Sequence, residues 1–230
     1  MRSNPDLRGL TDRVNLVVAL AAEARPIVER FALKTVSGSG PFRIYTDDRP
    51  AVRLIISGVG REASARAVSF LYTHASGTEK AAWLNVGVAG HRDFPLGTAV
   101  FADRITDRKS GRSWSLPREA MAEVASLVTV DRPVTDYPGE ELYEMEASGF
   151  CESTLGFCEP ALVRVLKIVS DNQDSPVDGI SAGGISGLIH RRIALVEQTV
   201  LSLGDLVSRC AGPEVSPTDP ASAVQTGPSL

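Results

Sequence analysis

The sequence predicts an α/β fold: a single-domain, three-layer sandwich in which helices flank a mixed, mostly parallel central β-sheet. The first observation is that apolar runs of strand length alternate with helical segments along most of the chain. The second is that several of these runs, such as residues 14–20 and 81–88, are apolar at all but one position. Strands of this kind are typical of parallel sheets that are buried on both faces.

The first run, residues 14–20, leads into a helical stretch that ends at Phe31. Pro26 is expected in the first turn of that helix, where its missing N–H costs nothing. Residues 42–46 and 52–57 predict two strands joined by a polar Asp-Asp-Arg-Pro turn, which makes a hairpin. Further strands are expected at residues 81–88, 98–105, 126–130 and 162–169, and further helices at 61–73, 117–125, 145–155 and 185–210.

The two ends of the chain differ in composition from the part between them. Residues 1–13 read as a polar arm, and residues 212–230 are rich in Pro, Ser, Thr and Gly, a composition typical of disordered segments. One globular domain is therefore expected over residues 14–211.

Composition and charge narrow the class of protein. The 230-residue chain is 43% hydrophobic and 23% charged, which is ordinary for a globular protein. Its net charge of -4 argues against non-specific binding to nucleic acid or to anionic membranes. No apolar run is long enough to span a bilayer, and the N-terminus lacks the apolar segment of a signal peptide. Three cysteines without a CxxC pair indicate neither a disulfide framework nor a zinc site. A cytoplasmic protein without metal or cofactor is expected.

Polar residues follow several of the predicted strands. Glu23 comes just after the first strand, the glycine-rich residues 87–90 end the central one, and Ser170 and Asp171 follow the last. Glu146 falls at a junction between a strand and a helix. Because ligands of open α/β sheets bind beyond the carboxyl ends of the strands, we expect these four places to converge on one site.

Two carboxylates, Glu144 and Glu146, bracket Met145 within an apolar stretch. At least one of them is expected to face a buried environment, which is unfavourable unless the acid has a partner or a task. The alternative is a solvated helix start, because acids favour the first turn of a helix.

Five segments together resemble one known superfamily. In chain order they read VALAAEARPIV, SGVGREASARA, LNVGVAGHRDFPLGTAVFAD, YEMEA and LKIVSDN, and they span roughly residues 14–209. They are similar to motifs of the purine nucleoside phosphorylase and nucleosidase superfamily, closest to the methylthioadenosine/S-adenosylhomocysteine nucleosidase branch. The resemblance implies a nucleoside phosphorylase-like fold and an enzyme that cleaves the N-glycosidic bond of a purine nucleoside. It also implies a homodimer, for which the apolar side chains of residues 61–73 offer a face.

The resemblance also assigns roles to individual residues. It implies that Glu146 binds the ribose hydroxyls, and that Met145 packs against the sugar. Asp171 would protonate the leaving purine with Ser170 orienting it, and Glu23 would act as the base for water. Glu144 receives no such role and is read as structural. Further substrate contacts are implied for Val88, Ala89, Gly90 and Val134.

Simpler readings stand beside two of these roles. A Ser-Asp-Asn sequence after a strand is commonly a turn or a helix cap. For Glu23 the simpler reading is a helix N-terminal charge paired with Arg25.

The sequence favours hydrolysis over phosphorolysis. Phosphorylases of this superfamily bind phosphate with an arginine and a serine at places that read Asn85 and Val88 here. A phosphate-dependent phosphorylase remains an alternative, because the amides of residues 87–90 could hold an anion and Arg25, Arg61 or Arg92 could supply charge.

Several departures from the family pattern leave further questions open. Val88 stands where nucleosidases carry a serine, and the segment before Glu144 is shorter than usual. Both support a second alternative, a nucleoside-binding member without turnover. Where the family offers adenine an aromatic ring, this chain has Asp131-Arg132-Pro133-Val134. The base and the 5′ substituent therefore stay open, and related enzymes with a similar first motif act on nucleosides with bulky apolar 5′ groups.

Overall fold

The computed structural model describes residues 13–38, 40–74, 80–175 and 180–211. The expected tail at 212–230 lies outside these residues, and so does the expected arm except for Arg13, which begins the first strand. Ten strands form one sheet: β1 (Arg13–Val18), β2 (Lys34–Thr35), β3 (Arg43–Thr46), β4 (Val52–Ile56), β5 (Ala81–Gly90), β6 (Ala99–Asp107), β7 (Ser113–Ser115), β8 (Glu123–Thr129), β9 (Leu142–Glu144) and β10 (Val163–Asp171). The helices are α1 (Ala21–Phe31), α2 (Arg61–His74), α3 (Ala147–Thr154), the 3-10 turn η2 (Pro160–Leu162), α4 (Ala182–Arg191) and α5 (Ile193–Ala211).

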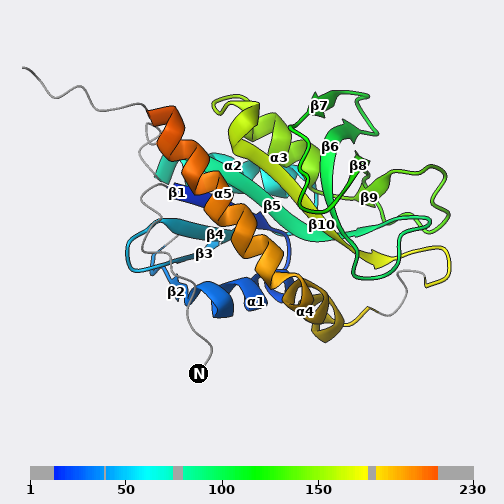
Figure 1. Ribbon diagram of the computed structural model, residues 1–230, viewed down its shortest axis with the longest axis horizontal. Helices are drawn as coiled ribbons and strands as arrows, with labels where there is room; N and C mark the ends of the chain where they lie inside the picture. Colours follow the sequence, from blue (N-terminus) through cyan, green and yellow to red (C-terminus); the bar gives the residue numbers. More distant parts are fainter. Residues whose placement is uncertain (1–12, 39, 75–79, 176–179, 212–230) are drawn as a thin grey trace, which may run out of the picture.

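One half of the sheet closes on itself. The hydrogen-bonded order is β10-β6-β8-β9-β5-β1-β4-β3-β2, and β10 pairs with β5 as well. The five strands β5, β10, β6, β8 and β9 therefore form a closed barrel, from which β1, β4, β3 and β2 extend as an open sheet (Figure 1). This arrangement places the parallel strands β1, β5 and β10 side by side at the centre of the fold.

The expected mostly parallel sandwich is only partly correct. Among the pairings of the described strands, five are parallel and five are antiparallel. Runs that are almost entirely apolar, as in β5, indicate burial on both faces. A strand of a covered barrel meets that condition as well as a parallel strand does.

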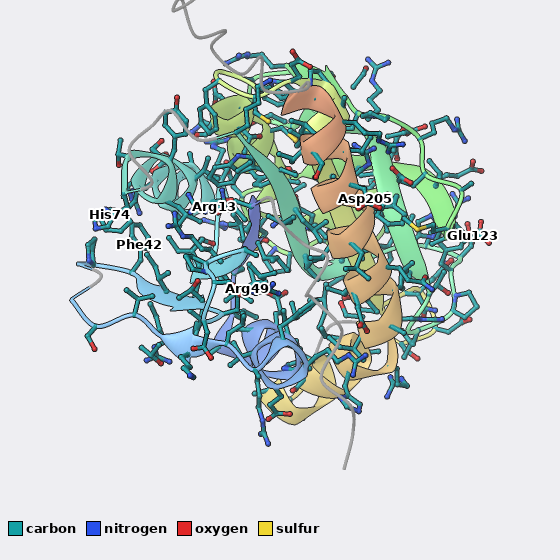
Figure 2. All side chains as sticks on the ribbon, turned by 60° about the vertical axis from the view of Figure 1, so that its left-hand side comes forward. Arg13, Phe42, Arg49, His74, Glu123 and Asp205 are labelled. Carbon is teal, nitrogen blue, oxygen red and sulfur yellow. The ribbon has the colours of Figure 1, made fainter. Side chains whose placement is uncertain are left out.

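Helices cover both faces of the sheet, as predicted. On one side α1, α4 and α5 lie together, with α5 running across β5 and β1 (Figure 1). On the other side α2 packs beside α3. Each layer closes its own apolar core, one that includes Phe31, Leu84 and Val200 and another that includes Leu71, Trp83 and Phe150. Charged residues such as Arg49, Glu123 and Asp205 lie on the exposed surface (Figure 2).

The structure corrects two expected helices and the expected position of Pro26. The helix expected at 117–125 is absent, because residues from Glu123 onward pair in parallel with β6 to form β8. The single helix expected at 185–210 is two helices, divided at Arg192, whose guanidinium donates to the carbonyl of Gly97 at 2.7 Å. The break lets α4 pack on α1 while α5 crosses the sheet. Pro26 lies in the second turn of α1, since that helix already begins at Ala21.

The hairpin of β3 and β4 and the helix at 61–74 agree with the prediction. None of the helices in the described part of the chain combines the length and the apolar character needed to cross a membrane.

Candidate active site

A cavity of about 220 Å³ lies beyond the carboxyl ends of β1, β5 and β10. Its walls come from the start of α1, the end of β5, the segment after β8, the junction between β9 and α3, and the end of β10. Every residue that the sequence nominated for the site is among those lining it: Glu23, Val88, Ala89, Gly90, Val134, Met145, Glu146, Ser170 and Asp171. The convergence expected from the strand-end rule is therefore present.

Glu23 lies in the first turn of α1 and its side chain is bound by backbone amides. One carboxylate oxygen accepts hydrogen bonds from the N–H groups of Ala19 and Leu20, both at 2.9 Å. The other accepts the N–H of Val88 in β5 at 3.0 Å. Burial raises the pKa of Glu23, while the charge of Lys167 and the three amides act in the opposite direction. Glu23 thus ties α1 to β5 at the edge of the cavity.

Glu144, at the end of β9, has protein partners for both oxygens of its carboxylate. It accepts the N–H groups of Glu146 and Ala147, which begin α3, at 2.9 to 3.0 Å. It also accepts the hydroxyl of Thr129 at 2.7 Å and forms a fully buried ion pair with Lys167 at 2.8 Å. These contacts agree with a structural reading of Glu144, because a carboxylate at a helix start satisfies amides that have no partner within the helix.

Glu146 is different although it lies only two residues further on. It precedes α3 at the expected junction of strand and helix. Within the described chain it accepts one hydrogen bond, from the N–H of Gly60 at 2.8 Å. Burial raises the pKa of Glu146 to about 7; the charge of Glu144 adds to this effect and that of Lys167 opposes it. A buried carboxylate with one donor has acceptor capacity left for a ligand.

Asp171, at the end of β10, is bound by two hydroxyl groups. Ser170 donates to one carboxylate oxygen at 2.5 Å, and the phenol of Tyr137 donates to the other. Burial raises the pKa of Tyr137, and its contact with Asp171 adds to that rise. The three residues are almost completely buried, although Ser170 and Asp171 reach the cavity wall.

Sequence reasoning missed two residues of this site, Lys167 and Tyr137. Lys167 could have been found from the sequence, because it places a charge in the middle of the largely apolar strand β10. Its ammonium is fully buried, and the charges of Glu144 and Glu146 outweigh burial and raise its pKa. It also lies close to Glu23, since a Cβ on Gly87 would come 2.9 Å from a Glu23 oxygen and 3.4 Å from the Lys167 Nζ. Tyr137 carried no signal, because its contact with Asp171 joins distant parts of the chain.

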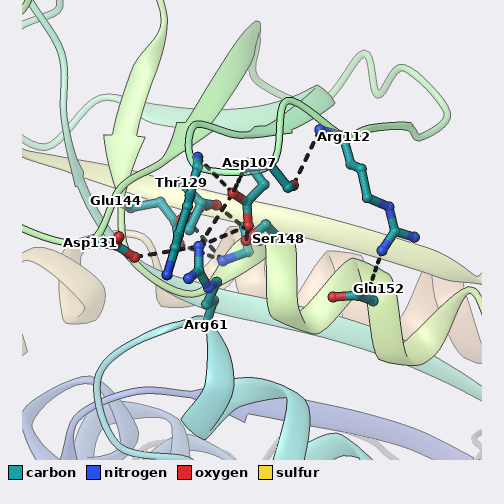
Figure 3. Close-up of polar contacts among 11 residues, drawn as sticks. Arg61, Asp107, Arg112, Thr129, Asp131, Glu144, Ser148 and Glu152 are labelled. Carbon is teal, nitrogen blue, oxygen red and sulfur yellow. Dashed lines mark hydrogen bonds and ion pairs between the residues drawn. The ribbon is translucent and has the colours of Figure 1, made fainter.

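The three arginines considered for binding an anion do not line the cavity. Arg25 pairs with Glu29 on the exposed side of α1, and Arg92 pairs with Asp93 and Glu140. Arg61 pairs with two acids, Asp107 and Asp131 (Figure 3).

A chain of hydrogen bonds links the ion pair of Arg61 and Asp107 to the cavity wall. Asp107 accepts the hydroxyl of Ser148 at 3.2 Å, and the N–H of Ser148 donates to Thr129 at 2.9 Å. Thr129 in turn donates to Glu144 (Figure 3). The network fixes the first turn of α3, and therefore the position from which Glu146 reaches the cavity.

Comparison with known proteins identifies the fold. No protein-family model matches the sequence, and no curated protein is similar to it in sequence. Solved structures do match. A 5′-methylthioadenosine nucleosidase from Arabidopsis thaliana superposes with a TM-score of 0.68 at 15% identity, covering 85% of this chain and 96% of that one. The 5′-methylthioadenosine/S-adenosylhomocysteine nucleosidase from Neisseria meningitidis, in complex with methylthio-immucillin-A, gives 0.65 at 16% identity, with 82% and 99% covered.

A futalosine hydrolase mutant from Helicobacter pylori matches as well, with a TM-score of 0.64 at 14% identity over 84% of this chain and 100% of that one. The fold is therefore shared with nucleosidases, as the sequence resemblance predicted. At these identities the likeness concerns the fold, and the chemistry has to be argued from the site itself.

Proposed function

We propose that this protein is a nucleosidase, which hydrolyses the N-glycosidic bond of a purine nucleoside to free base and sugar. The observation that carries the proposal is the meeting of Glu23, Glu146 and Asp171 in one cavity, although they come from α1, the start of α3 and the end of β10. N-glycoside hydrolysis needs a group for the sugar, an acid for the leaving base and a base for water. The three carboxylates supply one group for each task.

At the sugar, Glu146 is the proposed ligand of the ribose hydroxyls. Its single internal hydrogen bond leaves lone pairs for a vicinal diol, and its charge would stabilise a sugar ring that becomes cationic in the transition state. Met145 lines the cavity beside it and offers an apolar surface to the ring.

At the leaving base, Asp171 is the proposed general acid. The N-glycosidic bond breaks with its electron pair going to the base, and Asp171 supplies the proton that neutralises the developing negative charge. Ser170 holds one oxygen of the carboxyl group, which leaves its orientation fixed at the end of β10.

For the nucleophile, Glu23 is the proposed base that takes a proton from water as the oxygen attacks the anomeric carbon. Its raised pKa suits a group that has to accept this proton near neutral pH. Glu23 gains one proton and Asp171 loses one, so that nucleoside and water give the free base and the free sugar, and proton exchange with solvent restores both residues.

The charge of the cavity supports water rather than phosphate as the nucleophile. In the described part of the chain, the residues that line it include four acids, Glu23, Glu144, Glu146 and Asp171, and no lysine, arginine or histidine. The N–H of Val88, an amide considered for holding an anion, is already bound by Glu23. A phosphate dianion would meet repulsion there, because the nearby ammonium of Lys167 is buried behind the cavity wall and already paired with Glu144.

The rest of the lining supports an apolar 5′ substituent of the methylthioadenosine kind. Around the acids the cavity wall is made largely of aliphatic side chains. These are Leu20, Val59, Val88, Val130, Val134 and Ile185. A polar or charged 5′ group would lose its hydration against such a wall without gaining hydrogen bonds.

The proposal is tested by incubating the protein with adenosine, inosine, guanosine and 5′-methylthioadenosine, with and without inorganic phosphate, and measuring free base. We expect release of base without phosphate, fastest for 5′-methylthioadenosine. Asp174→Asn, which removes a nearby exposed acid, is the matched control for Asp171→Asn. Release that requires phosphate would establish a phosphorylase, and no release from any nucleoside would favour a binding protein without turnover.

We further propose a cytoplasmic homodimer. In the structure α2 turns Ala67, Val68 and Leu71 toward the sheet, so that a partner would meet the half-buried Ala63, Ala65 and Phe70. Sedimentation at micromolar concentration tests this, and a monomer alone would refute it.

A further inference from the structure

We propose that Tyr137 is a positioning residue for the leaving-group acid: it holds Asp171 from behind and stabilises the carboxylate that remains when the proton has passed to the base. The inference rests on the proposed function of Asp171. Tyr137 comes from the segment between β8 and β9. It has no other role in the proposed mechanism.

The geometry places the phenol behind the carboxylate. Asp171 lines the cavity, whereas Tyr137, whose hydroxyl donates to Asp171, is not among the lining residues and is 1% exposed. The ring packs against the end of β5, since a Cβ on Gly90 would lie 2.7 Å from the Cε1 of Tyr137. It also meets the edge of Tyr143, with ring centroids 6.3 Å apart. The phenol is therefore enclosed and aimed at a single acceptor.

The backbone supports a specific role for this residue. Tyr137 has a φ of 37°, in the left-handed region that a bulky side chain rarely adopts. Strained residues of this kind persist where the surrounding structure determines them, and they are concentrated at functional sites. Here the strained backbone turns the ring inward onto Asp171.

The chemistry follows from the two hydroxyl donors. Before the reaction Asp171 carries a proton, and this proton moves to a ring nitrogen of the purine as the N-glycosidic bond breaks. The Asp171 carboxylate that is left accepts hydrogen bonds from Tyr137 and Ser170, so its new charge is stabilised without the movement of water. The raised pKa of Tyr137 keeps the phenol protonated at neutral pH, which makes it a permanent donor and not the source of the proton.

The test compares two leaving groups in the full-length protein. Tyr137→Phe removes only the hydroxyl, and Tyr72→Phe, on α2 where the ring stacks on Phe157, is the matched control. With 5′-methylthioadenosine we expect kcat to fall roughly tenfold to a hundredfold, the loss of one hydrogen bond to a charged group, with KM nearly unchanged. With 4-nitrophenyl β-D-ribofuranoside, whose phenolate leaves without a proton, we expect both variants to match the parent. Adding Tyr137→Phe to Asp171→Asn should cause no further loss.

Equal slowing of both substrates would show that Tyr137 only supports the fold, and an unchanged kcat for 5′-methylthioadenosine would also overturn the inference. If Tyr137→Phe does not fold, ring-fluorinated tyrosine at position 137 keeps the shape and alters the strength of the donor. A change in turnover confined to the purine substrate would then support the role, and no change or an equal change would refute it. A parent protein inactive on every nucleoside and on the nitrophenyl riboside would overturn the proposed function together with this inference.

Discussion

The two ends of the cavity hold their carboxylates in different ways. At the end where we propose that the sugar binds (the sugar end), Glu23, Glu144 and Glu146 surround the buried ammonium of Lys167 and accept backbone N–H groups. At the end proposed for the leaving base (the base end), Asp171 has no cation among its hydrogen-bond partners in the described chain, and it is bound by the hydroxyls of Ser170 and Tyr137. The first arrangement holds negative charge in fixed positions. The second surrounds one acid with neutral donors.

This difference corresponds to the tasks that we propose. Backbone amides and a buried ammonium are fixed dipoles and charges, so they suit carboxylates that have to keep a fixed orientation beside a cationic sugar. Hydroxyl groups can rotate to donate or accept, so they tolerate an acid that loses and regains a proton. Burial raises the pKa of Glu146 to about 7, the charges of Glu144 and Glu23 add to the rise, and the one ammonium that the three carboxylates share opposes it.

The largest effect is expected from breaking the base end. Asp171→Asn should lower kcat by about a hundredfold to ten-thousandfold, the usual contribution of general acid catalysis, and change nucleoside binding little. Steady-state kinetics and equilibrium binding of 5′-methylthioadenosine measure the two quantities. Asp174→Asn should behave like the parent. An Asp171 variant that is folded and fully active would remove this residue from the mechanism.

At the sugar end, removal of the charge of Lys167 should mainly lower the stability of the fold. Lys167→Met leaves Glu144 buried without its partner, and we expect the free energy of unfolding to fall by about 3 to 5 kcal/mol. Lys34→Met removes an exposed lysine that pairs with Asp48, and it should change stability by less than about 1 kcal/mol. Urea denaturation of both variants makes the comparison. Similar losses from the two would contradict the assignment of Lys167 as the central charge.

The pH dependence of stability sharpens the comparison. The pKa of Glu146 rises from its ordinary value of 4.5 to about 7 on folding. Between these two pH values, the Glu146 carboxyl is therefore protonated in the native state and ionised in the unfolded chain. The contribution is fully present below about pH 4.5 and is lost as pH rises toward 7, by at most about 3 kcal/mol. Glu146→Gln should flatten the decline between pH 5 and 7, and Glu152→Gln, at an exposed acid of α3, should not. A decline of the same size in the Glu146→Gln variant would exclude Glu146 as its source.

The smallest expected effect separates the two acids of the YEMEA segment. If Glu146 binds the ribose hydroxyls, a 2′-deoxy nucleoside should bind about tenfold to a hundredfold more weakly than its ribose parent. Glu146→Gln should reduce that difference, and Glu144→Gln should leave it unchanged while lowering stability. Titration calorimetry with adenosine and 2′-deoxyadenosine gives both affinities. A difference that persists at full size in the Glu146 variant would refute the sugar-binding role.

Most of the site could be predicted because its residues follow a local rule. Glu23, Gly90, Ser170 and Asp171 come directly after or at the ends of apolar strands, and the strand-end rule needs no knowledge of long-range contacts. The prediction failed where tertiary pairing decides local structure. The local sequence predicts a helix up to residue 125. The residues from Glu123 onward instead form strand β8, which pairs with β6.

By itself the sequence determined the α/β class, the strands β1, β5 and β10, and two acids placed by them, Glu23 after β1 and Asp171 at the end of β10, because apolar runs and the polar residues that follow them are local signals. Only the tertiary structure decided that β5, β10, β6, β8 and β9 close into a barrel, that Lys167 balances Glu144, and that Tyr137 reaches Asp171. The physical reason is the distance in sequence. A buried charge or phenol needs a partner, but which partner it meets depends on how the sheet brings remote segments together, and that is encoded in packing across the whole chain rather than in any one stretch of it.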